Sequence, residues 1–178
     1  MSSPAEAAAV PPIDDQQLWA LMKQADDIGL RLELTASGIS WETTPGLRHQ
    51  ELCFEVMQSI RPPDSPETAC KCLKFIDVAI RFPNGMVKRP DVSIFCQRPA
   101  EEEGFVRRVP EAVVEIVSPG YESKDLVSGP PLYLGQGVRD VLVLDRTTNA
   151  VHHFRQSEAT QHPSPKVFLL ECGCSVTL

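Results

Sequence analysis

The sequence predicts a mixed α/β domain built on one central β-sheet flanked by helices. Two segments have apolar residues at helical spacing, and several others are short apolar or alternating runs typical of strands. Helices come first along the chain and most strands follow, an order that favours one sheet with helices packed against it. The length of 178 residues and an apolar fraction of 42% are sufficient for one packed core.

The first third of the chain is expected to form a helix, a hairpin and a second helix. An aspartate near the start can cap a helix over residues 14–29, where a glycine ends it. Residues 31–34 and 39–42 alternate as the two strands of a hairpin, with a Ser-Gly turn between them. Helical periodicity returns over residues 49–60.

The rest of the chain is expected to supply the sheet. We interpret residues 72–82 as one long strand of mixed burial. Residues 111–118 and 138–145 are nearly all apolar, as expected of central strands. A strand over 150–154, a helical segment near 124–136 and two short final strands complete the predicted fold.

Two terminal features set the expected domain limits and location. Residues 1–12 are mostly small residues and prolines, so we expect a mobile tail followed by a single domain over 13–178. No apolar run is long enough to span a membrane, and the N-terminus lacks a signal-peptide pattern. A cytoplasmic protein without a membrane partner is therefore expected.

Six cysteines are present, and four of them form Cys-x-Cys pairs at 70–72 and 172–174. The simplest interpretation is buried free thiols, and disulfides are not expected without a secretion signal. This spacing differs from the Cys-x-x-Cys of zinc knuckles, and a four-cysteine metal site would require the two pairs to meet in space. Both interpretations remain open at this point.

The net charge of −7 argues against a protein that binds nucleic acid over its whole surface. Basic residues are nevertheless concentrated in the middle of the chain, because residues 48–108 contain ten lysines and arginines against nine acidic residues. One basic face could hold a phosphate backbone. A mixed, solvated surface explains the same charges equally well.

Two carboxylates interrupt apolar strand segments. Asp91 opens the run VSIF, and Glu115 lies inside VVEIV. A buried carboxylate without a partner is costly, and two on neighbouring strands would repel each other. A divalent cation with oxygen ligands would resolve both problems, whereas pairing of each carboxylate with an arginine or lysine is the structural alternative.

Several segments resemble a known family. Three segments occur in the order seen in the putative restriction endonuclease branch of the PD-(D/E)XK nuclease superfamily. The first, RPDVSIF, resembles the family's R-x-PDV, and the second, VPEAVVEIVSPGYESKDL, resembles VEVLSPST…D. The third, LYLGQGVRDVLVLD, resembles Y…GV-x-EYWLVD. Upstream, RLELTASGISWETTPGLRHQ is similar to the opening of that family, and RFPNGMVKRPD is similar to the segment that leads into its PD motif. The resemblance spans roughly residues 30–155 and implies a restriction-endonuclease-like core with a central mixed sheet flanked by helices.

The resemblance implies a set of site residues. Asp91 and Glu115 match the metal-binding carboxylates, and the carbonyl of Ile116 would join them around Mg²⁺ or Mn²⁺. Glu33 matches an upstream acidic position facing the site, although a solvent-facing strand residue is its alternative. His49 matches a histidine near the site, with packing on the hairpin as its alternative.

The sequence departs from the family at the lysine that assists the attacking water. Within the stretch from Asp125 to Tyr133, Gly129 occupies the position where the family carries this lysine, and Pro130-Pro131 follow. Because proline breaks a helix interior, both the lysine and its supporting helix are expected to be missing. Lys124 is the nearest substitute, and an exposed loop lysine is the alternative.

Two functions from different classes follow. The first is a Mg²⁺-dependent DNA endonuclease that hydrolyses phosphodiester bonds, weakened by loss of the usual lysine. The second is a catalytically degenerate nuclease fold that binds nucleic acid or assists protein assembly. The resemblance also implies DNA as the partner and a homodimer as the assembly.

Overall fold

The computed structural model describes residues 13–63, 70–100, 104–118, 120 and 122–178. The predicted N-terminal tail lies outside these residues. The helices are α1 (Asp15–Asp27), α2 (Leu47–Ser59), the π-helix η1 (Lys124–Ser128) and α3 (Gly129–Gly135). The strands of the first half are β1 (Leu30–Thr35), β2 (Gly38–Thr43), β3 (Leu73–Ile76), β4 (Ile80–Arg81), β5 (Val87–Lys88) and β6 (Val92–Phe95). Those of the second half are β7 (Ala112–Ile116), β8 (Asp140–Asp145), β9 (Ala150–Phe154), β10 (Ala159–Pro163), β11 (Val167–Leu169) and β12 (Ser175–Thr177).

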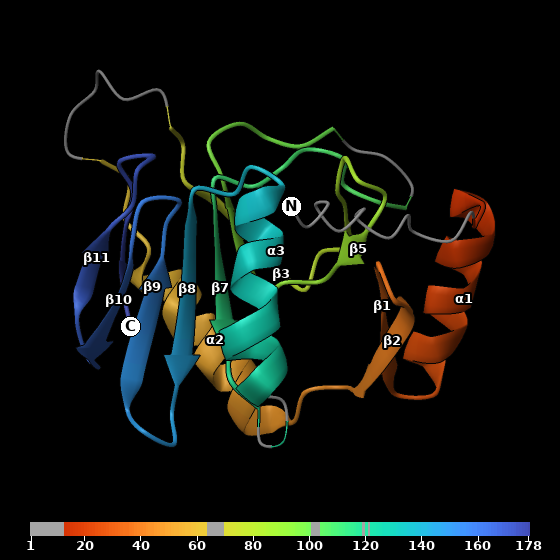
Figure 1. The fold of residues 1–178 in the computed structure, drawn as a ribbon, viewed down its shortest axis with the longest axis horizontal. Helices are drawn as coiled ribbons and strands as arrows, with labels where there is room; N and C mark the ends of the chain where they lie inside the picture. Colours follow the sequence, from red (N-terminus) through yellow and green to blue (C-terminus); the bar gives the residue numbers. More distant parts are fainter. Residues whose placement is uncertain (1–12, 64–69, 101–103, 119, 121) are drawn as a thin grey trace, which may run out of the picture.

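A six-stranded mixed sheet with the order β10-β9-β8-β7-β6-β3 forms the centre of the molecule. Only β7 and β8 run parallel within it, and the segment η1–α3 connects them across one face of the sheet. A smaller sheet with the order β2-β1-β5-β4 lies to one side with α1, and β11 pairs with β12 in a third sheet (Figure 1). The predicted mixed α/β class, with its helix–hairpin–helix beginning and central mixed sheet, is confirmed.

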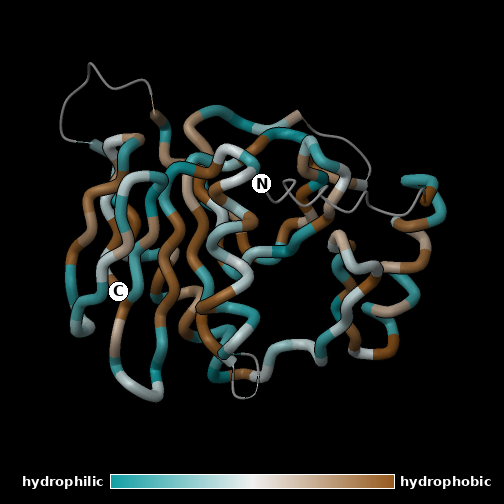
Figure 2. The backbone as a smooth tube through the Cα atoms, viewed as in Figure 1, coloured by the Kyte–Doolittle hydropathy of each residue, from teal (hydrophilic) through white to brown (hydrophobic). Residues whose placement is uncertain are grey.

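The core is divided by the central sheet into two faces. Alternate side chains of β7 and β8 point to opposite sides, as a strand requires. Val114 and Leu142 pack with Leu52 of α2 on one face, whereas Val113 and Val141 pack near α3 on the other. The hydrophobic colouring of the central strands in Figure 2 follows from burial on both sides.

The expected long strand over residues 72–82 is wrong. The chain forms β3, leaves the central sheet at Asp77, and re-enters pairing as β4 of the smaller sheet. Asp77 adopts a φ of 52°, in the left-handed region that ends regular strand geometry. Its carboxylate is held by Arg31 and Arg89, at 2.8 Å in each pair. These tertiary ion pairs stabilise a break that the apolar pattern does not reveal.

The expected loss of the helix around Pro130-Pro131 is also wrong. η1 continues directly into α3, and the two prolines occupy the first turn of α3. Proline is tolerated there because first-turn N–H groups have no partner within their own helix. The helical support is therefore present although the lysine is absent.

The cysteines depart from the expectation of separate free thiols. Cys70 contacts Cys96 and Cys72 contacts Cys174 at disulfide-bonding positions. Cys172, like Cys53, is buried and unbonded. The two Cys-x-Cys pairs thus meet in space although 102 residues separate Cys72 from Cys174. Among the described residues, no helix is long and apolar enough to cross a membrane.

Candidate active site

Asp91 and Glu115 lie side by side on neighbouring strands. Val92 of β6 is opposite Val114 of β7, so the antiparallel register brings the residue before β6 beside Glu115. The Asp91 N–H donates to Glu115 Oε2 at 3.1 Å, and the Ile116 N–H donates to Asp91 Oδ2 at 2.8 Å. The N–H and C=O of one strand residue project from the same strand edge, so the Ile116 carbonyl faces the Asp91 side as well.

The surroundings of Glu115 disfavour its ionised form. Asp91 is buried, with 6% of its surface exposed. Burial, reinforced by the neighbouring Asp91, raises the pKa of Glu115 to about 8. Tyr133 partly opposes this effect by donating its hydroxyl hydrogen to Glu115 Oε1 at 2.5 Å. The pair therefore lacks enough positive charge to hold both groups ionised.

A polar cavity of about 20 Å³ lies between these groups. A cavity of roughly 10–15 Å³ is enough for one water molecule, so this cavity has room for a single small ion or water. Every residue expected at the site lines it: Glu33, His49, Asp91, Glu115, Ile116 and Lys124. The structure thus brings together residues that are spread over 92 positions of the sequence, from 33 to 124.

Glu33 is held in this cavity by two lysines. It is 5% exposed, which excludes the alternative of a solvent-facing strand residue. Glu33 forms a close ion pair with Lys88 and lies 3.1 Å from the Lys124 ammonium. Burial alone would raise the pKa of Glu33, but Lys88 and then Lys124 outweigh it and lower the pKa to about 2.

Lys124 extends from η1 into the site. It pairs with Glu42 of β2 as well as with Glu33, and about one third of its side chain is exposed. Beside it, Asp125 has its pKa raised to about 6, because burial outweighs the attraction of Lys124. Lys124 is therefore an ion-paired residue of the cavity wall and not an isolated loop lysine.

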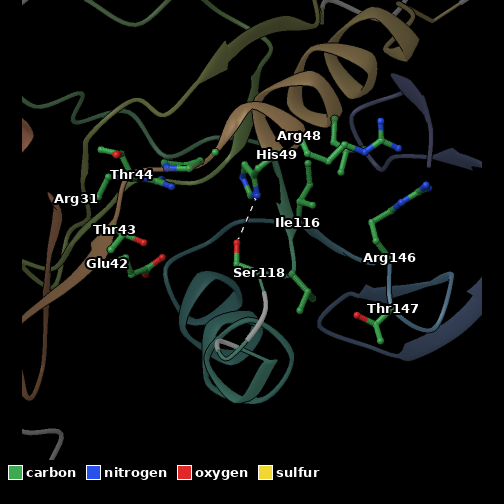
Figure 3. Close-up of a pocket in the computed structure, with 14 residues that line it drawn as sticks. Arg31, Glu42, Thr43, Thr44, Arg48, His49, Ile116, Ser118, Arg146 and Thr147 are labelled. Atoms are coloured by element: carbon green, nitrogen blue, oxygen red, sulfur yellow. Dashed lines mark hydrogen bonds between the residues drawn. The ribbon is translucent and has the colours of Figure 1, made fainter. Parts of the chain in front are cut away.

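His49 lies in the first turn of α2 and its side chain reaches Asp91. Its Nε2 atom is 2.9 Å from Asp91 Oδ1. Its Nδ1 atom is 3.5 Å from the Ser118 hydroxyl, which follows β7 (Figure 3). His49 therefore connects α2 with the ends of β6 and β7.

Sequence reasoning missed two residues that contact these groups, Arg31 and Lys88. Arg31 lies 3.5 Å from Asp91 and 2.8 Å from Asp77, and Lys88 pairs with Glu33. Lys88 could have been found from its position three residues before Asp91, whereas the contacts of Arg31 join distant elements that no local pattern indicates. Tyr133 was matched to the family motif, but its hydrogen bond to Glu115 was not expected.

A larger cleft of about 520 Å³ opens next to the small cavity. Figure 3 shows its walls, with the β2–α2 connection on one side and the β8–β9 turn on the other. Arg48 and Arg146 are exposed on this cleft, and His49, Ile116 and Ser118 lie on its floor. The cleft shares His49, Ile116 and Ser118 with the small cavity, and its basic side chains provide a surface suited to a phosphate-bearing ligand.

Comparison with known proteins identifies the family of this chain. No similar protein was found among the curated proteins. One similar solved structure is a protein from Anabaena variabilis described as a putative nuclease belonging to DUF820, with 21% identity, a TM-score of 0.64 and 88% coverage of each chain. The Uma2 family model, described as putative restriction endonuclease, matches residues 17–172. The chain therefore belongs to the Uma2 family and has a nuclease-like fold.

Proposed function

We propose that this protein is a Mg²⁺- or Mn²⁺-dependent DNA endonuclease whose metal site consists of Asp91, Glu115 and the Ile116 carbonyl. The observation that carries the proposal is the adjacency of two carboxylates around an ion-sized cavity. Hard divalent cations prefer such oxygen ligands. A cation would also supply the positive charge that the Glu115 environment lacks.

The surrounding residues have separate roles in this proposal. When bound, the divalent ion would make a bound water more acidic and stabilise negative charge on the phosphate. Asp91 and Glu115 hold the ion, and Glu115 releases its proton as the ion binds. Arg48 and Arg146 contact the DNA backbone along the cleft.

Lys124 substitutes for the family lysine in this account. Its ammonium lies at the cavity wall, where it can stabilise charge on the phosphate or orient the attacking water. Its two glutamate partners partly neutralise that charge, so we expect slower cleavage than a free, correctly aimed lysine would give.

The test measures metal binding and cleavage separately. We expect Mn²⁺ at 100 times its Kd to stabilise the protein by about 2.7 kcal/mol, which raises Tm by roughly 5–10 °C. Plasmid DNA should be nicked under the same conditions. Asp91→Ala should remove both effects, whereas Asp27→Ala, which changes an exposed aspartate at the end of α1, should retain both.

A binding module without activity is the second candidate. The observation in its favour is that Lys88 and Lys124 are both engaged by glutamates, while Gly129 occupies the usual lysine position. Metal-dependent stabilisation and DNA binding without any cleavage would support this candidate. A folded wild-type protein with no Mn²⁺ or Mg²⁺ response would exclude the proposed metal site.

A further inference from the structure

Five of the six cysteines gather at a second place in the molecule, away from the candidate active site. Cys70 precedes β3 and Cys96 follows β6, at the end of β6 opposite to Asp91. Cys96 lies five positions after Asp91, which is about 16 Å along an extended strand. Cys172 and Cys174 lie in the turn between β11 and β12. A metal at this cluster would therefore be distinct from one held by Asp91 and Glu115.

The sulfur positions bring both bonded pairs close to one centre. Besides its bond to Cys96, the Cys70 sulfur lies 3.4 Å from that of Cys174 and 3.9 Å from that of Cys72, and these two are bonded to each other. In a tetrahedral zinc–thiolate site with Zn–S bonds of about 2.3 Å, sulfurs are about 3.8 Å apart. Cys70, Cys72 and Cys174 lie within 4.8 Å of one another, so reduction of the two bonds would leave three thiols close to the spacing of three ligands of one ion.

The fourth ligand is assigned by proximity to Cys70. The Cys96 sulfur contacts that of Cys70, and the Cys96 carbonyl accepts the Lys71 N–H at 3.1 Å, which fixes the two segments together. Cys172 is also within 4.8 Å of Cys70 and Cys96 but is bonded to neither, so Cys96, whose sulfur directly contacts that of Cys70, is the better fourth ligand.

The local backbone presents the sulfurs toward one another. The Leu170 N–H donates to the Cys174 carbonyl at 2.8 Å, and the Gly173 N–H donates to the Leu170 carbonyl at 2.8 Å. This closes a tight turn in which Gly173 has a φ of 88°, a conformation that glycine adopts without strain. Cys174 is fully buried, so the turn aims its sulfur into the protein.

We propose that the reduced protein binds one zinc ion through Cys70, Cys72, Cys96 and Cys174, as a structural centre that fastens the β11–β12 hairpin to the central sheet. Soft thiolate ligands select zinc over Mg²⁺, so the two metals would not compete for the same site. The ion and the two disulfides are mutually exclusive states of these four sulfurs. Binding requires all four as thiolates, and their four protons are released.

Metal content and thiol count test this proposal together. Protein purified with a reductant from zinc-supplemented cells should contain one zinc per chain. After denaturation with a chelator it should show six reactive thiols. A metal-free protein with two reactive thiols, its intact mass lower by four hydrogens, would instead establish the two disulfides and overturn the proposal.

Variants then test the ligand set. Cys72→Ser and Cys174→Ser should each lose the zinc, while Cys172→Ser, the matched change of the nearest unassigned cysteine, should keep it. Asp91→Ala should also keep it, because the carboxylate site is separate. If a ligand variant fails to fold, removal of zinc from the wild type with a chelator should still lower Tm, and zinc but not Mg²⁺ should restore it. Zinc retained in Cys72→Ser or Cys174→Ser, or lost in Cys172→Ser or Asp91→Ala, would refute this assignment.

Discussion

Asp140 and Glu115 occupy similar positions in the sequence but opposite electrostatic environments. Each is a carboxylate in an apolar strand of the central sheet, in VRDVLVLD and VVEIV respectively. Asp140 is fully buried and accepts hydrogen bonds from His153, Arg155 and the Glu171 N–H, at 2.8, 2.6 and 2.7 Å. These bonds outweigh the effect of burial and lower its pKa.

Glu115 faces another carboxylate, and its pKa is raised. The difference shows that an acidic residue in an apolar strand does not by itself indicate a metal site. What distinguishes the two is whether the protein supplies enough donors and positive charge for the ionised form. Asp140 has hydrogen-bond donors for its ionised form within the protein, whereas the raised pKa of Glu115 is the reason why we propose that the Asp91–Glu115 pair binds a cation.

The largest expected effect is on the free energy of unfolding, which should depend strongly on Asp140 and weakly on Asp91. Asp140→Ala removes the buried acceptor shared by His153, Arg155 and the Glu171 N–H, so we expect a loss of about 3 kcal/mol in the free energy of unfolding. Asp91→Asn retains an acceptor for the Ile116 N–H and removes repulsion toward Glu115, so its metal-free stability should change by less than about 1 kcal/mol. Urea unfolding of both variants without metal provides the measurement. Equal losses would remove the distinction between the two carboxylates.

The second prediction concerns pH. The folded-state pKa of Glu115, about 8, exceeds its ordinary value of 4.5, so the folded protein binds the extra proton between these limits. Metal-free stability contributed by Glu115 is therefore present below pH 4.5 and falls as pH rises toward 8. The apparent Mn²⁺ affinity should change in the opposite direction, by about tenfold per pH unit in this window, because binding displaces that proton.

Glu115→Gln provides the control for this pH dependence. The substitution removes the titrating group and one proposed metal ligand. The fall in metal-free stability should therefore flatten between pH 6 and pH 8, above the pKa of Asp125, and the Mn²⁺ response should be lost. Tm measured over this range, with and without Mn²⁺, reports both quantities. A metal response that is independent of pH in the wild type would contradict the raised pKa.

The smallest expected effect concerns Lys124. We expect Lys124→Ala to slow plasmid cleavage about tenfold, since its charge is already shared with Glu33 and Glu42. The Mn²⁺-induced rise in Tm should persist, because Lys124 is not a metal ligand. Lys23→Ala, an exposed lysine on α1, should leave both quantities unchanged. Loss of all cleavage in Lys124→Ala would identify Lys124 as the essential lysine.

The sequence predicted the elements whose signals are local. The amphipathic residues of α1 and α2, the hairpin β1–β2 and the apolar strands β7 and β8 lie close to their expected positions. Asp91 and Glu115 were recognised because they interrupt apolar strand segments and match the family motifs, and Glu33 because the family has an acidic residue at its position. The fold brings all three to one cavity.

Features that depend on tertiary partners were not predictable in the same way. The break at Asp77 is stabilised by Arg31 and Arg89, which come from other strands or connections. The two prolines of α3 were misjudged because their effect depends on position within the helix, which composition alone does not give. The cysteine cluster requires the chain end to pack against β3 and β6, a contact with no local signature.

At Asp77 the chain passes from the central sheet to the smaller sheet, and the use of two sheets has a consequence for protein design. The central sheet carries Asp91 and Glu115, but Glu33 and Glu42 belong to the smaller sheet, so the cavity is completed only where the two sheets meet. A minimal fragment that retained β6, β7 and α2 would keep the carboxylate pair and His49 and lose the opposite wall. Transplanting this site to another scaffold therefore requires grafting both sheets together with the arginine–aspartate contacts that set their relative position.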